Sequence, residues 1–371
     1  MINKKRLTDK FCRLVSIDSV PFQERTMADV LKKELSDLGF EVTEDNTGEL
    51  YHGSCGNVYG YLQGDLEGDP ILFSAHMDTV EPGKGKKAML REDGTITSDE
   101  TTVLGADDLS GVVSILEAVR SILEKGIPHR SIEVLFTYAE EVYIRGSEVF
   151  DFSMVKAKEA YVLDLDDAVG TAAFKAPTLV SFTARFLGKA SHAGFAPEQG
   201  IHAIAAAAQA ITQIRQGRID EETTVNVGTI EGGKARNIVP ELCTLQGEVR
   251  SQQHEKAVAE AEKIREIFHS AASGFGAELE FTTSYGCIAY EVPVQHPVIA
   301  RFEQVCRDLG YPTRLIHTFG GSDNNNFLRN GITGIVLSCG MNKVHSLQEW
   351  THVDELEKCS NIVLKLMTSK E

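Results

Sequence analysis

Short apolar segments that end at a histidine or a carboxylate recur along this sequence. Residues 71–75 have the length and composition of a strand buried in a parallel sheet, and His76 and Asp78 follow directly. Residues two positions apart on an extended chain point to the same side. Because ligands of open α/β sheets bind at the carboxyl ends of the strands, we expect both side chains at a ligand-binding edge.

Later segments place further acids and a second histidine in similar positions. The residues concerned are Glu140 and Glu141 after the strand expected at 132–137, Asp164 after residues 161–163, His345 after residues 334–339, and Asp107, just before a helical pattern over 109–124. Any one of them has an ordinary structural explanation, such as an aspartate capping a helix. Several together in one chain favour a common site at one edge of the sheet.

The alternation of strands and helices predicts a mostly parallel sheet. Between residues 178 and 289 the order changes to β-α-β-β-α-β, which is typical of a ferredoxin-like unit, and the α/β pattern then resumes. A chain of 371 residues also exceeds one ordinary core. We therefore predict an α/β domain at 1–177 and 290–371, with an α+β domain at 178–289 inserted into it.

The composition excludes several classes of protein. A formal charge of −17 argues against nucleic acid or an anionic membrane as a partner. Seven scattered cysteines without a C-x-x-C pair indicate reduced thiols. We see neither a signal peptide nor an apolar run of membrane-spanning length, so we expect a cytoplasmic protein.

Carboxylates gathered at one edge of a sheet repel one another and shift one another's pKa values. Two divalent cations would remove this repulsion, with one carboxylate as a bridge. Ligands of mixed histidine and carboxylate type suit zinc, with cobalt or manganese as alternatives. The pattern therefore favours a metal centre.

Four motifs resemble those of the M20 family of dinuclear zinc peptidases, and most closely its peptidase T-like, aminotripeptidase-related branch. They are His-Met-Asp-Thr-Val at 76–80, Gly-Ala-Asp-Asp at 105–108, Ala-Glu-Glu at 139–141 and Val-His-Ser at 344–346. The resemblance extends over nearly the whole chain. It implies a zinc-peptidase α/β domain and an inserted lid and dimerisation domain.

The resemblance also implies metal ligands. One metal would be bound by His76 and Asp164, and the second by Glu141 and His345, with Asp107 bridging the two. Asp166 is a rival to Asp164, because the run from 164 to 167 departs from the family pattern. His352 is a weaker rival to His345.

Further roles follow from the same resemblance. Glu140 would be the general base that takes a proton from a metal-bridging water, and Asp78 would orient His76. The peptide bond between Asp107 and Asp108 would be cis. In the inserted domain, His192 would stabilise the oxyanion, reaching the partner's site in a homodimer formed through this domain. Substrate-binding residues would be Asn237, Arg250 and Asp323.

The leading hypothesis is a metallopeptidase that releases an N-terminal residue from a short peptide. The alternatives are an M20 amidohydrolase or carboxypeptidase acting on N-acyl amino acids or related amides, and a catalytically silent metal-binding scaffold. Retention of Glu140, a base that binds no metal in this assignment, argues against the scaffold.

Overall fold

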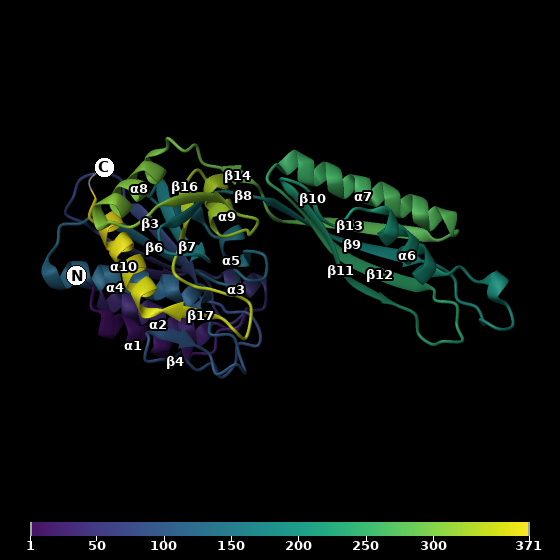
Figure 1. Ribbon diagram of the computed structural model, residues 1–371, viewed down its shortest axis with the longest axis horizontal. Coiled ribbons are helices and arrows are strands. Elements are labelled where there is room, and N and C mark those ends of the chain that lie inside the picture. Colours follow the sequence, from purple (N-terminus) through teal and green to yellow (C-terminus); the bar gives the residue numbers. More distant parts are fainter. Residues whose placement is uncertain (1, 370–371) are drawn as a thin grey trace. The chain divides into compact units, whose positions relative to one another are not determined.

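The computed structural model describes residues 2–369, which divide into two compact units. The large unit comprises the chain up to Lys175, Glu291–Thr318 and the chain from Ser322 onward. The inserted unit comprises Ala176–Tyr290 and Phe319–Gly321. Figure 1 shows both units and labels many of their helices and strands.

The large unit is built on a mixed nine-stranded sheet whose centre is parallel. The order is β1-β2-β6-β3-β7-β16-β8-β14, with β15 beside β8. Its strands are β1 (Glu41–Glu44), β2 (Val58–Leu62), β3 (Ile71–His76), β6 (Ile132–Thr137), β7 (Glu159–Leu165), β8 (Thr171–Ala176), β14 (Tyr290–Glu291), β15 (Arg314–His317) and β16 (Thr333–Ser338). Strands β6, β3, β7 and β16 run parallel, so their carboxyl ends share one edge.

Helices cover this sheet. They are α1 (Lys4–Val15), α2 (Arg25–Asp37), α3 (Thr47–Leu50), α4 (Ala106–Lys125), α5 (Arg145–Glu148), α8 (Pro297–Leu309), α9 (Asn324–Arg329) and α10 (Val353–Met367), with a 3₁₀ turn η1 (Phe152–Met154). Helix α4 packs against β3 and β7 and also against α1 and α10, which explains why it is apolar on most sides. Every residue of β3 is buried, as expected for a central parallel strand.

A small antiparallel sheet lies in the same unit, with β4 (Met89–Leu90), β5 (Thr95–Thr97) and β17 (Trp350–His352). Strand β17 comes just after the segment that carries His345. None of the helices within residues 2–369 combines the length and apolar character that crossing a membrane requires.

The inserted unit is an antiparallel sheet of order β10-β11-β12-β9-β13 with two long helices (Figure 1). Its elements are β9 (Thr178–Leu187), η2 (Pro197–Gln199), α6 (Ala203–Gln213), β10 (Gly217–Asp220), β11 (Thr223–Gly232), β12 (Leu242–Ser251), α7 (His254–Gly274) and β13 (Glu278–Cys287). Alternate residues of β9, among them Phe182 and Phe186, pack with Phe268 of α7 in one apolar core. The predicted fold class is confirmed, and the short edge strand β10 is an addition that the sequence analysis missed.

Candidate metal centre

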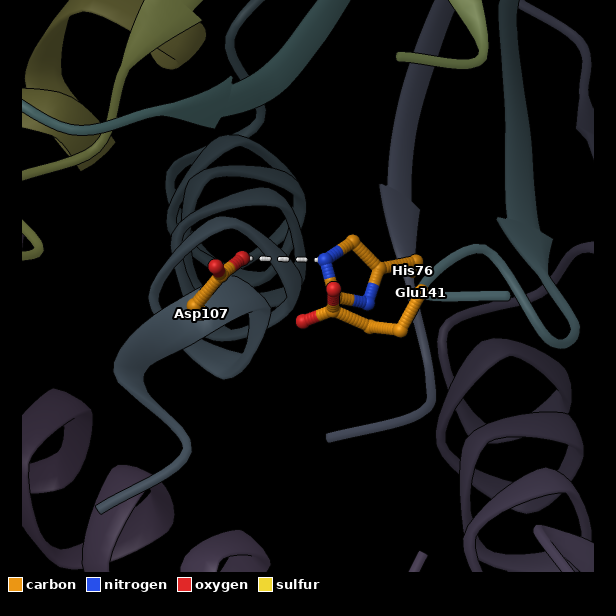
Figure 2. Close-up of side chains that lie close together, drawn as sticks. All are labelled: His76, Asp107 and Glu141. Carbon is orange, nitrogen blue, oxygen red and sulfur yellow. Dashed lines mark hydrogen bonds and ion pairs between the residues drawn. The ribbon is translucent and has the colours of Figure 1, made fainter. Parts of the chain in front are cut away.

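The carboxyl edge of the parallel strands gathers the predicted metal-ligating side chains. His76 is the last residue of β3, Asp164 lies near the end of β7, and Glu141 follows the end of β6. Asp107 opens α4, and His345 follows β16. Figure 2 shows His76, Asp107 and Glu141 converging from a strand end, a helix start and a loop.

Asp107 lies between the two histidines. Its Oδ1 is 3.0 Å from Nε2 of His76, and its Oδ2 is 3.3 Å from Nε2 of His345. Asp164 Oδ1 lies 3.8 Å from Nε2 of His76, and Glu141 Oε2 lies 3.0 Å from Nε2 of His345. The five side chains thus form two groups that share one carboxylate.

The donor atoms are close enough to hold cations. Ligand atoms of His76, Asp107 and Glu141 lie within 4.8 Å of one another, and so do those of His76, Glu140 and Asp164. Imidazole and carboxylate donors in this mixture suit zinc and related divalent ions. Glu140 thus lies close to two of the predicted ligands, His76 and Asp164. From this position it can act either as a further ligand or as a base beside the ligands.

Asp164 and its rival Asp166 differ in position. The Asp164 carboxylate lies in the set with His76 and Glu140. Asp166 follows the last residue of β7, is exposed, and belongs to neither set of possible ligands. Nε2 of the alternative His352 donates to the backbone oxygen of Asp93, and its side chain accepts from the N–H of Asp354 as the N-cap of α10. The geometry therefore favours Asp164 and His345.

The pKa values reflect the crowding of these groups. Burial and neighbouring carboxylates, Asp164 foremost, raise the pKa of Glu140, and burial likewise raises that of Asp164. Burial also acts to raise the pKa of Asp107, but hydrogen bonds from His345 and His76 outweigh it and hold that pKa below its usual range. Hydrogen bonds to Asp107 and Glu141 raise the pKa of His345 to about 10. The site thus attracts positive charge, which divalent cations supply in place of protons.

Asp78 contacts both His76 and the loop that carries Glu140 and Glu141. Its carboxylate accepts hydrogen bonds from the backbone N–H groups of Glu140 (2.9 Å) and Glu141 (3.0 Å). Nδ1 of His76 lies 2.9 Å from the main-chain oxygen of Asp78 and 3.5 Å from its Oδ1. The imidazole is therefore oriented mainly by the backbone of Asp78, and the carboxylate mainly holds the loop that carries the two glutamates.

Two other buried acids accept hydrogen bonds from the backbone at or next to the predicted ligands. Asp108 accepts from the backbone N–H of His76 (3.1 Å), and the peptide bond between Asp107 and Asp108 is cis, as the resemblance implies. Glu349, 1% exposed, accepts from the N–H groups of Gly105 (2.8 Å) and Asp107 (2.9 Å). The sequence analysis missed Glu349, because a carboxylate four residues beyond a histidine is too common to be a signal.

His192 lies on a loop of the inserted unit. Its Nδ1 accepts from the N–H groups of Gly194 (3.1 Å) and Phe195 (3.2 Å), and the exposed ring of Phe195 stacks on the imidazole. A nitrogen that accepts hydrogen bonds carries no proton, so the neutral imidazole has its proton on Nε2. His192 therefore presents a hydrogen-bond donor to solvent.

The three predicted substrate-binding residues lie in different surroundings. Asn237 is exposed, and its carbonyl accepts from the N–H of Ala193. Arg250 pairs with Glu248 and donates to the carbonyl of Phe319 within the same unit.

Asp323 is 2% exposed in the large unit, and its oxygens accept from the hydroxyl groups of Thr137 and Ser147. A substrate contact through Asp323 stays a prediction that this burial does not support. The observed contacts instead connect the end of β6 to α5.

Two family models match the sequence. Residues 176–275 match the peptidase dimerisation domain of the M20 type, and residues 57–217 match peptidase family M28. Among curated relatives, the uncharacterized protein YqjE of Bacillus subtilis is 38% identical over 99% of both chains. Peptidase T of Staphylococcus saprophyticus is 25% identical over 97% of both chains.

Solved structures show the same likeness. A tripeptidase from Staphylococcus aureus is 32% identical, with a TM-score of 0.95, over 99% of this chain and 98% of the other. The aminopeptidase PepT from Bacillus cereus is 37% identical, with a TM-score of 0.90, over the same shares. Hydantoinase/carbamoylase-type amidases share the fold at 16% identity.

Proposed function

Because this chain belongs to the M20 peptidases, in their peptidase T-like branch, we propose that it releases the N-terminal residue from short peptides such as tripeptides. It is a hydrolase of peptides that uses divalent metal. The observation that carries the finer proposal is the pair of ligand groups that share Asp107, with Glu140 buried beside them. Relatives described as tripeptidase and peptidase T supply the substrate class.

We assign the metal ligands as two sets. His76 and Asp164 would hold one ion, Glu141 and His345 would hold the other, and Asp107 would be a ligand in both sets. Two zinc ions bound there would polarise the scissile carbonyl and lower the pKa of the attacking water. The two sets lie at one edge of the sheet, so a peptide that reaches one set also reaches the other.

Glu140 is assigned as the general base. Its side chain is buried, and the carboxylates around it raise its pKa, which favours a group that takes up a proton and releases it again. Glu140 takes a proton from the attacking water and passes it to the leaving amine. The hydrogen bond from the backbone N–H of Glu140 to Asp78 keeps the Glu140 carboxylate beside His76 and Asp164.

We further propose a homodimer formed through the inserted unit, with His192 of one protomer serving the site of its partner. The match to a dimerisation domain over residues 176–275 supports this arrangement. The Nε2–H of His192 would donate to the oxyanion that forms during hydrolysis, a contribution of about 2.7–4 kcal/mol at comparable sites. We place the enzyme in the cytoplasm, because all seven cysteines are free.

The test is Glu140→Gln. We expect the variant to keep its metal content and to lose turnover by about 10²–10⁴-fold, since a base and not a ligand is removed. Asp166→Asn is the matched control, because it removes an exposed acid that follows β7 and belongs to neither ligand set. A loss of metal as large as that in His76→Ala would make Glu140 a ligand and overturn the assignment.

A substrate panel separates peptidase from amidase. We expect tripeptides to give the highest kcat/KM, ahead of dipeptides and N-acyl amino acids. The opposite ranking would replace the proposed function by the amidohydrolase alternative.

A further inference from the structure

The loop that follows β6 is held at four consecutive backbone N–H groups, those of residues 138–141. Each donates to a side-chain oxygen, and the acceptors come from segments far away in the sequence: Asn57 Oδ1 for Tyr138 (3.0 Å), Glu24 Oε1 for Ala139 (3.0 Å), and the two oxygens of Asp78 for Glu140 and Glu141. We call residues 138–141 with these acceptors the amide clamp.

The clamp stabilises a backbone turn that the chemistry needs. Successive residues of a regular strand face opposite sides of the sheet, so Glu140 and Glu141 can serve one site only if the chain leaves the strand geometry. Ala139 has φ +48°, in the left-handed region, which is unfavourable for a residue with a Cβ. After this turn, both glutamates lie within ligand distance of His76.

Glu24 is the acceptor at the turn itself. It precedes α2 at the N-cap position, yet its side chain makes no capping hydrogen bond, so helix capping does not explain it. The side chain is fully buried, and its Oε1 is directed at Ala139, 115 residues away. Burying a carboxyl group is unfavourable, and contacts of this kind are retained where they fix a geometry.

The second oxygen of Glu24 has no hydrogen-bond partner among the described residues. Burial, and then the charge of Asp78, raise the pKa of Glu24 to about 8. Burial thus favours the uncharged form of this acceptor. A glutamine, which is uncharged and has the same length, reproduces this acceptor.

We propose that Glu24 is a positioning residue for catalysis: by holding the N–H of Ala139 it fixes the left-handed turn that directs Glu140 toward His76 and Asp164. This inference rests on the proposed role of Glu140 as the base. It assigns no contact between Glu24 and substrate or metal.

The test compares two variants of similar side-chain volume. Glu24→Gln keeps an acceptor at Ala139, and we expect its kcat to stay within about 3-fold of wild type. Glu24→Met has no acceptor, and we expect kcat to fall by about 10–100-fold, the usual effect of losing an outer support of a metal site, with KM and metal content unchanged. A folded Glu24→Gln protein with more than about a tenfold loss of kcat would overturn the acceptor role, whether or not Glu24→Met folds.

A second change at Ala139 distinguishes positioning from general stability. Glycine adopts positive φ without the Cβ penalty, so Ala139→Gly reduces the dependence of the turn on Glu24. We expect the double variant Glu24→Met, Ala139→Gly to recover at least about 3-fold in kcat over Glu24→Met. No recovery would mean that Glu24 does not act through this turn.

The outcomes also separate this inference from the proposed function. Turnover that survives in Glu140→Gln would overturn the assignment of Glu140 as the general base, on which this inference rests. Turnover that is lost in Glu140→Gln but unchanged in Glu24→Met would overturn only the positioning role of Glu24.

Discussion

Replacing Asp78 by asparagine tests which part of Asp78 the site uses. The resemblance implies that the Asp78 carboxylate orients His76, whereas the structure places that carboxylate on the N–H groups of Glu140 and Glu141. His76 Nδ1 lies closer to the main-chain oxygen, at 2.9 Å, which no side-chain replacement removes. Asp78→Asn should therefore disturb the glutamate loop and leave His76 in place.

The size of the effect follows from the two hydrogen bonds. Asparagine retains one acceptor oxygen and turns an NH₂ group toward the second N–H, so one bond to a charged acceptor is lost. Such a bond contributes about 1.5–3 kcal/mol, and Asp78 is fully buried, so water cannot replace it. With about 1.36 kcal/mol per factor of ten, we expect kcat to fall by about 10–150-fold.

The assay measures metal content and kcat together. Added metal should restore the occupancy of the metal site that contains Glu141. It should not restore kcat, because the Glu140 side chain remains displaced from its position beside the ligands. His76→Ala provides the comparison for loss of a ligand. If Asp78→Asn loses metal as His76→Ala does, and saturating metal returns kcat to the wild-type value, the carboxylate acts on His76 and our reading of the contacts is wrong.

Three further predictions concern other parts of the molecule. Glu349→Gln, which loses one of two acceptors behind Asp107, should weaken metal binding by about 10–100-fold in a chelator competition, and unchanged affinity would contradict this role. Burial lowers the pKa of Lys86 from an ordinary 10.5 to about 8 in the folded protein. Because the unfolded chain binds this proton more tightly, the free energy of unfolding should rise as the pH increases from 8 to 10.5. Lys86→Met should remove about 3 kcal/mol of this rise in denaturant unfolding, and an unchanged pH profile would refute it. Mixed dimers of His192→Ala with Glu140→Gln should regain roughly a quarter of wild-type turnover, since half of the dimers are mixed and each has one intact site; no regain would exclude action in trans.

The sequence predicted well what depends on strand periodicity. Residues 71–76 and 132–137 form strands because their side chains are apolar on both faces, and the acids that follow them meet because parallel strands end at one edge. Helix α4 opens at Ala106, but Asp107 and Asp108 have non-helical φ and ψ angles, so its continuous helical part begins at Leu109, where the sequence predicts it. Strand β10 was missed because four residues at a sheet edge carry too short a pattern.

The supports of the site could not be predicted in the same way. Glu24, Asn57 and Glu349 act on backbone N–H groups, and every residue except proline has such a group, so no residue type marks the partner. The contacts exist only once distant segments are packed together. The same limit applies to Asp323, whose burial and whose hydrogen bonds from Thr137 and Ser147 follow from tertiary packing and not from its motif.

The position of β16 sets the order in which a new chain can be completed. This strand lies between β7 and β8, although 156 residues separate the end of β8 from its first residue, Thr333. At ribosomal rates of about 5–20 residues per second, β16 is therefore synthesised roughly 8–30 seconds after β8. During that interval β7 and β8 have no strand between them, and their open edges can pair with other chains. A nascent chain stalled before residue 333 is therefore expected to be a client of chaperones and not a partly active peptidase.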